Sequence, residues 1–90
     1  MIHVRAATVA DAAFLIAGNA AMALETEGVT LDPAILSRGV RAVLADSAKG
    51  RYFIAEQDGQ AAGMMMVTWE YSDWRDGVFW WVQSVYVPPA

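Results

Sequence analysis

The chain has 90 residues, ten acidic against six basic side chains, a formal net charge of −4 and no cysteine. This length indicates a single domain, 1–90, near the lower limit at which a hydrophobic core alone gives stability. Without cysteine, disulfides and cysteine-based zinc sites are excluded, and the lone histidine makes any metal site improbable. The acidic balance and the scattered cations argue against a nucleic-acid partner, which would require a basic face.

Hydrophobic residues make up 57% of the chain even with glycine left out, whereas soluble domains have roughly 45–50% with glycine included. No uninterrupted apolar run approaches the roughly 18–20 residues of a spanning helix, so we expect no membrane contact. The first residues lack the order of a signal peptide, which predicts a cytoplasmic protein. We therefore expect part of the apolar surface to meet protein that is not among these 90 residues.

The first half of the chain predicts a strand and two helices. Residues 2–6 alternate between apolar and polar side chains, as a half-buried strand does. Thr8 and Asp11 have the composition of a helix start, and apolar residues at helical spacing continue to residue 27. Gly28 is a suitable C-terminal stop. A second helix is expected after Asp32, the N-cap, with a proline at its first position.

The second half predicts three strands, at 51–56, 61–71 and 78–87. Asp58-Gly59 is among the strongest short hairpin signals and separates the first two. Gly63 marks a bulge in the second strand. Residues 72–77 form another turn. The order β-α-α-β-β-β predicts an α+β domain with two helices packed on a mixed, mostly antiparallel sheet.

The final strand, 78–87, lacks clean alternation and therefore resembles a strand buried on both faces in the middle of a sheet. It is nevertheless the last element of the chain, where a simple meander would leave it as an unprotected edge. We therefore expect its neighbour to come either from a second copy, in a homodimer, or from a C-terminal half missing from these residues.

Three groups of residues resemble a known family. Val85-Tyr86-Val87-Pro88-Pro89 fits the apolar-x-Val-x-Pro ending of a fourth strand, and 50–63 resembles the second and third strands. Segments 69–75 and 79–84 are similar to a bacterial subgroup of small enzymes. Together they resemble the N-terminal half of the GNAT superfamily of N-acetyltransferases. The resemblance implies acetyl transfer from acetyl-CoA to an amine, with acetyl-CoA as cosubstrate.

The resemblance also implies a cofactor site along the last strand. In the family, the main chain at positions matching Val85, Tyr86 and Val87 lies against the pantetheine arm of acetyl-CoA as an added strand would. The pyrophosphate is held by an Arg/Gln-x-x-Gly-x-Gly/Ala loop at a helix N-terminus after this strand. The sequence ends at Ala90, before that loop, so we expect these 90 residues alone to bind acetyl-CoA weakly or not at all and to have weak or no activity.

Catalysis of acetyl transfer needs a base that helps to generate the free amine. Where the family often has a carboxylate on its fourth strand, this chain has Gln83 and Ser84, which can position a water or the acceptor. The resemblance places Glu25 and Glu27 at the acceptor pocket, with a solvated helix end as the alternative.

Aromatic residues leave a similar choice. Trp69 and Trp74 are candidates for walls of the acceptor site, with core packing as the alternative, while Trp80 and Trp81 are expected in the core or an interface. The acceptor itself is left open between small molecules and peptide amines. A different class of function is also left open, namely a non-catalytic dimerisation or partner-binding module that uses the C-terminal strand.

Overall fold

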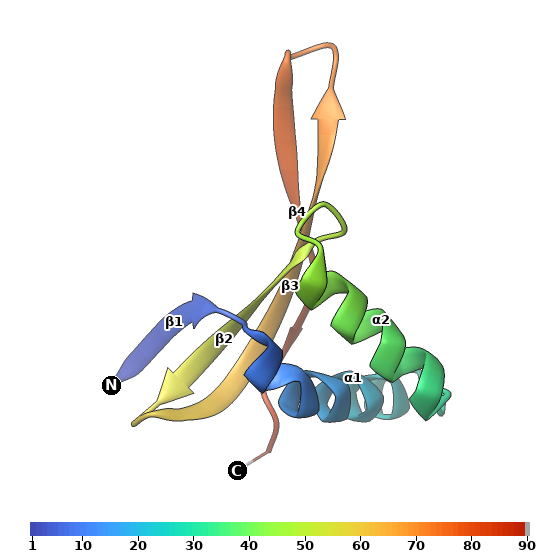
Figure 1. Cartoon of the computed structure of the whole chain (residues 1–90), viewed down its shortest axis with the longest axis vertical. Helices are drawn as coiled ribbons and strands as arrows, with labels where there is room; N and C mark the ends of the chain where they lie inside the picture. Colours follow the sequence, from blue (N-terminus) through green and yellow to red (C-terminus); the bar gives the residue numbers. More distant parts are fainter. Residues whose placement is uncertain (90) are drawn as a thin grey trace.

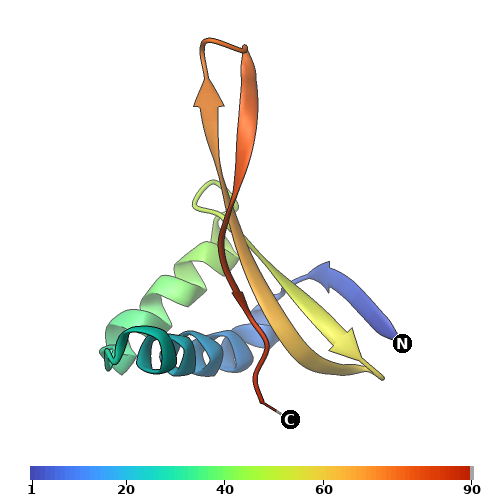
Figure 2. The same ribbon diagram turned by 180° about the vertical axis from the view of Figure 1, so that it is seen from behind.

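The computed structural model describes residues 1–89, which fold as two helices on one face of a four-stranded sheet (Figures 1 and 2). The elements are β1 (Ile2–Ala6), the 3-10 turn η1 (Val9–Asp11), α1 (Ala12–Glu27), α2 (Pro33–Ala45), β2 (Arg51–Gln57), β3 (Gln60–Ser72) and β4 (Gly77–Tyr86). The sheet order is β1-β2-β3-β4, and each neighbouring pair is antiparallel. The predicted α+β fold and element order are confirmed.

Local chemistry sets the helix ends as the sequence predicts. The Asp32 carboxylate accepts hydrogen bonds from the backbone N–H groups of Ala34 and Ile35, at 2.9 and 3.1 Å. Gly28 ends α1 in the left-handed conformation, with φ 65°. The start of α1 differs slightly from the prediction: a 3-10 turn comes first and the helix begins at Ala12, because the Asp11 side chain turns back to accept from the Thr8 N–H at 2.7 Å.

The β2–β3 hairpin turns through Asp58 and Gly59, whose φ angles are 53° and 82°. Two successive left-handed residues are what a two-residue type I′ turn requires. The predicted bulge lies beside Gly63: Ala55 pairs with Gly63 while the next residue of β2 pairs with Ala61, which leaves Ala62 as the extra residue.

The core lies between the helices and the sheet. Leu15 of α1, Val40 of α2 and Ile54 of β2 are almost completely buried and pack with Tyr52 and Met64. Burying such side chains gives roughly 1.5–3 kcal/mol each, which is the main stabilising contribution in a chain without cross-links.

Gly18 brings α1 close to the sheet. A Cβ at this position would collide with the Sδ atom of the buried Met64 and would lie 3.6 Å from Tyr86 Cδ2. The absence of a side chain therefore allows α1 to approach β3 and β4 directly.

The outer part of the β3–β4 hairpin projects beyond the helices (Figures 1 and 2). Its tip is tied by a hydrogen bond of 2.5 Å from Tyr71 Oη to Asp76 Oδ1 and by the Arg75 guanidinium, 5.5 Å from the centre of the Phe79 ring. The projection leaves aromatic side chains of this hairpin without a helix to cover them.

The expectation that the last strand is buried on both faces is wrong for the part of the chain described. β4 is an edge strand, and Trp80, Trp81 and Val82 are 62, 52 and 60% exposed. The physical reason is that this stretch lies on the projecting hairpin, and within residues 1–89 only β3 pairs with it. The apolar side chains of this strand are therefore either covered by a partner outside these residues or exposed on the surface, and they do not belong to the core of this sheet.

The segment Val9–Glu27 is long and apolar enough, by length and composition alone, to cross a membrane. Counting only uninterrupted apolar runs overlooks it, because isolated polar residues such as Asn19 interrupt the run. Core helices of soluble proteins meet the same criterion, and here Ala12, Leu15 and Gly18 are buried within the domain.

Candidate functional site

A β-bulge interrupts β4 at the centre of the predicted catalytic stretch. Met66 pairs with Ser84 whereas Val67 pairs with Val82, so Gln83 is the extra residue. The Gln83 amide Nε2 donates a 2.7 Å hydrogen bond to Thr68 Oγ1 on β3. Bulges redirect side chains and often lie beside active sites. Here the bulge fixes the Gln83 amide against the neighbouring strand.

Beyond the bulge, alternate residues of β4 face opposite sides of the sheet. Ser84 and Tyr86 lie on the side of the helices, since Tyr86 contacts α1. Val85 and Val87 lie on the other side and line an apolar hollow of about 180 Å³ with residues of β1, β2 and β3. The outer edge of this strand presents backbone groups that no other strand of residues 1–89 pairs with.

A cleft of about 420 Å³ lies between α1 and the end of β4. Its lining residues are Phe14, Ala17, Gly18, Ala21, Glu25, Tyr86, Pro88 and Pro89. The Tyr86 hydroxyl donates a 2.5 Å hydrogen bond to Glu25 Oε2 at the rim. This hydrogen bond raises the pKa of Tyr86 above its usual value of 10, so the phenol stays protonated and remains a donor at neutral pH.

The structure brings some of the predicted site residues together and separates others. Glu25 and Tyr86 form the polar rim of the cleft, and Gln83 and Ser84 lie two to three residues back along β4. Glu27, the last residue of α1, is exposed and does not line the cleft.

Trp69 and Trp74, the candidates for walls of the acceptor site, lie away from the α1–β4 cleft, because the hairpin that carries them projects beyond the helices. Trp69 packs across the strands on Trp80, with ring centres 5.7 Å apart. Trp74 is 94% exposed at the turn. Within the described residues, neither lines the α1–β4 cleft.

Sequence reasoning did not identify the floor of the cleft, which Ala17, Gly18 and Ala21 form. The signal available was small residues at helical spacing on one face of the first helix. The Glu25–Tyr86 pair spans 61 positions and has no local signal.

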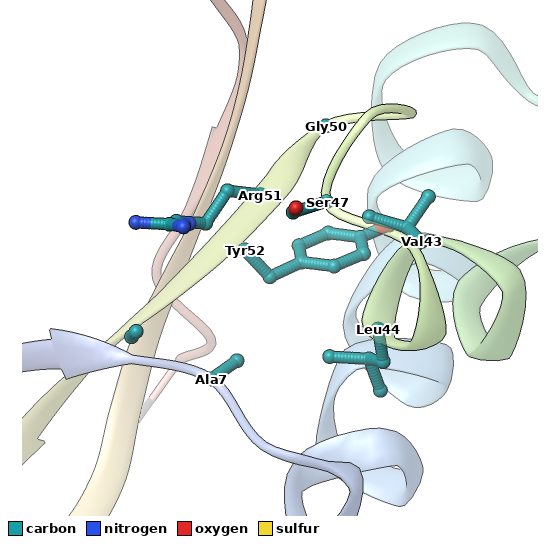
Figure 3. Close-up of a pocket in the computed structure, with 8 residues that line it drawn as sticks. Ala7, Val43, Leu44, Ser47, Gly50, Arg51 and Tyr52 are labelled. Carbon is teal, nitrogen blue, oxygen red and sulfur yellow. The ribbon is translucent and has the colours of Figure 1, made fainter.

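A second hollow, of about 300 Å³, lies between α2 and the start of β2 (Figure 3). The Tyr52 ring points towards Val43 and Leu44 of α2, whereas the Arg51 guanidinium points away from the helices. None of the predicted site residues lines this hollow. Within residues 1–89, no group of three or more potential metal ligands is present.

The chain has the element order and the antiparallel strand pairing that the sequence resemblance predicts. A strand, two helices and a three-stranded antiparallel meander are the arrangement expected for the N-terminal half of a GNAT acetyltransferase. No protein-family model and no curated protein matches the chain, but solved structures do.

A possible acetyltransferase from Clostridium difficile 630 matches with 41% identity and a TM-score of 0.92, over 97% of this chain and 57% of that protein. A predicted acetyltransferase from Clostridium acetobutylicum, solved with acetyl-CoA, matches at 20% identity with a TM-score of 0.72, over 99% of this chain and 61% of that one. A GNAT family acetyltransferase from Staphylococcus aureus matches at 9% identity with a TM-score of 0.70, over 96% and 62%.

These matches confirm that the chain has the fold of the N-terminal part of GNAT acetyltransferases. The two matches of lower identity show the fold alone. The chain spans somewhat more than half the length of these proteins, 57–62% of each.

Proposed function

We propose that the domain to which these residues contribute transfers an acetyl group from acetyl-CoA to an amine, with the acceptor bound in the α1–β4 cleft. The observation that carries this proposal is the 41% identity to a possible acetyltransferase over 97% of the chain. The bulged edge of β4 and the adjoining cleft with a carboxylate at its rim add to it.

The free edge of β4 suits the cosubstrate. The pantetheine arm is an extended chain with amide groups, and an exposed strand edge binds such a chain through its own N–H and C=O groups. Val85, Tyr86 and Val87 would line it, and acetyl-CoA, when bound, supplies an acetyl thioester.

The residues of this chain would prepare the amine. Attack of the amine on the thioester forms the C–N bond and breaks the C–S bond, the amine loses a proton, and CoA leaves as a thiolate that takes up a proton from water. The carboxylate of Glu25, which lines the cleft, accepts the proton of the amine either directly or through a water molecule. Gln83 and Ser84 position the acceptor or that water, and the phenol of Tyr86 holds the carboxylate in place.

The test is amine-dependent release of CoA by a chimera in which residues 1–87 replace the matching part of the C. difficile protein. We expect release of CoA that depends on the amine, with the C. difficile protein as the parallel control. A chimera that folds but fails to bind acetyl-CoA, while the C. difficile protein binds it, would contradict the proposal.

A second candidate function is self-association through β4, as a dimerisation module without catalysis. It is supported by the exposed aromatic residues Trp80 and Trp81 and by the unpaired edge that carries them. Sedimentation showing a monomer at micromolar concentration would exclude this candidate.

A further inference from the structure

The α1–β4 cleft has an uneven charge distribution. Seven of its eight lining residues contribute apolar or small side chains or a phenol, and the eighth, Glu25, carries a negative charge. Phe14 adds an aromatic ring to the lining, and the small residues Ala17, Gly18 and Ala21 leave room for an apolar body between the helix and Pro88. A ligand that fits this surface combines an apolar part with one group that complements a carboxylate.

No cation of the described residues stands in the cleft. Helix α1 contains no lysine, arginine or histidine. Arg5, the arginine just before it, is held by Asp11 at 2.8 Å and by Glu56 at 3.1 Å. A substrate carboxylate would therefore meet no counter-charge from the lining and would lie near the like charge of Glu25.

Tyr86 orients the carboxylate and leaves part of it free. The phenol donates to Oε2 of Glu25, and within residues 1–89 no hydrogen bond engages Oε1. Glu25 is itself exposed, so an incoming ammonium group can reach Oε1 from solvent. The pair is thus a ready acceptor of charge-assisted hydrogen bonds.

We infer that the cleft selects a primary amine carried on an apolar body and without a carboxylate, an alkyl- or arylalkylamine in place of an amino acid. This inference rests on the proposed acetylation of amines and names the class of acceptor for it. Glu25 binds the ammonium group, and Tyr86 is the positioning residue that holds Glu25.

Three matched probes test the inference by amide chemical shifts of the ¹⁵N-labelled 90-residue chain. 2-Phenylethylamine has the ammonium group alone, phenylalanine adds a carboxylate, and 2-phenylethanol lacks the charge. We expect 2-phenylethylamine to shift the amides of residues 14–25 and 86. We expect phenylalanine and 2-phenylethanol each to bind at least about fivefold more weakly than the amine, because one partly exposed ion pair has about that effect.

Variants locate the effect. Glu25→Gln is expected to weaken binding of 2-phenylethylamine about fivefold, whereas Glu27→Gln, the same charge change two residues later and outside the cleft, leaves it unchanged. Tyr86→Phe keeps the ring but removes the hydrogen bond, and is expected to weaken binding of the amine while binding of 2-phenylethanol is unchanged.

Three results would overturn the inference. They are equal binding of phenylalanine and 2-phenylethylamine, equal effects of Glu25→Gln and Glu27→Gln, or no shifts along α1 with 2-phenylethylamine. None of these measurements involves acetyl-CoA. Failure of the chimera to transfer acetyl therefore refutes the proposed function alone, whereas acetyl transfer to amino acids that is insensitive to Glu25→Gln refutes this inference alone.

Discussion

Asp11 shows how one side chain fixes the start of the first helix. It is 8% exposed and accepts a hydrogen bond of 2.8 Å from each terminal nitrogen of Arg5, as well as one from the Thr8 N–H. Chiefly through the hydrogen bonds from Arg5, the pKa of Asp11 falls from 3.8 to about 2. The pair therefore ties β1 to the beginning of α1.

The lowered pKa of Asp11 predicts how stability depends on pH. Because the folded state favours the carboxylate, this contribution is complete above about pH 4 and is lost as the pH falls towards 2. We expect Asp11→Asn to remove part of the decline in the urea midpoint over that interval and to cost about 2 kcal/mol at neutral pH. Asp73→Asn, at an exposed turn, is the control. An unchanged pH profile in Asp11→Asn would contradict this account.

Substitutions at two helical glycines are expected to change the stability of the fold in opposite directions. A side chain at Gly18 meets the buried Met64, whereas a Cβ at Gly39 of α2 has nothing within 4 Å. We expect Gly18→Leu to destabilise the fold by about 1–3 kcal/mol through overpacking and Gly39→Ala to stabilise it by up to about 1 kcal/mol. Denaturant unfolding measures both, and a Gly18→Leu variant as stable as the wild type would show that α1 does not lie this close to the sheet.

At the scale of elements, the β3–β4 hairpin is the part of the fold that most needs a partner to cover its apolar side chains. Its outer half carries exposed aromatic residues on an edge strand, beyond the cover of the helices. An unpaired apolar edge of this kind pairs readily with another strand. Self-association would use the aromatic residues of this outer half, whereas acetyl-CoA is proposed to bind beside 85–87, so variants in the outer half test self-association alone.

Trp81 tests self-association directly. If β4 pairs with a second copy, Trp81→Lys places a charge in the interface and shifts the dimer towards monomer. Trp74→Lys, at the 94% exposed turn, makes the same change outside the strand and is expected to leave the sedimentation coefficient as it was. A dimer that Trp81→Lys does not weaken would count against pairing through β4.

At the scale of the whole molecule, the sequence predicted those features that local chemistry decides. Asp32 with its proline, Gly28, and the Asp58-Gly59 turn mark the ends of elements by hydrogen bonding and backbone preference alone. The order of elements followed from them, and so did the fold class. The exposure of β4 was not predicted, because an apolar strand has the same composition whether it is covered by its own chain or by other protein.

The candidate site was predicted only in part, for the same reason. The residues of β4 and Glu25 were both found from a resemblance to a family. The contact of Glu25 with Tyr86 joins positions 61 residues apart, which depends on how α1 crosses the sheet. Trp69 and Trp74 lie away from the α1–β4 cleft, and nothing in their local pattern shows that the hairpin that carries them leaves the domain.

The central claim is that the outer edge of β4 receives acetyl-CoA while its α1 side receives the amine. The most direct test is to map acetyl-CoA on the ¹⁵N-labelled chimera by amide chemical shifts. The account predicts that the shifts centre on 83–87 and that 2-phenylethylamine then adds a separate set along α1. Shifts that spare β4 altogether, in a chimera that binds acetyl-CoA, would contradict it.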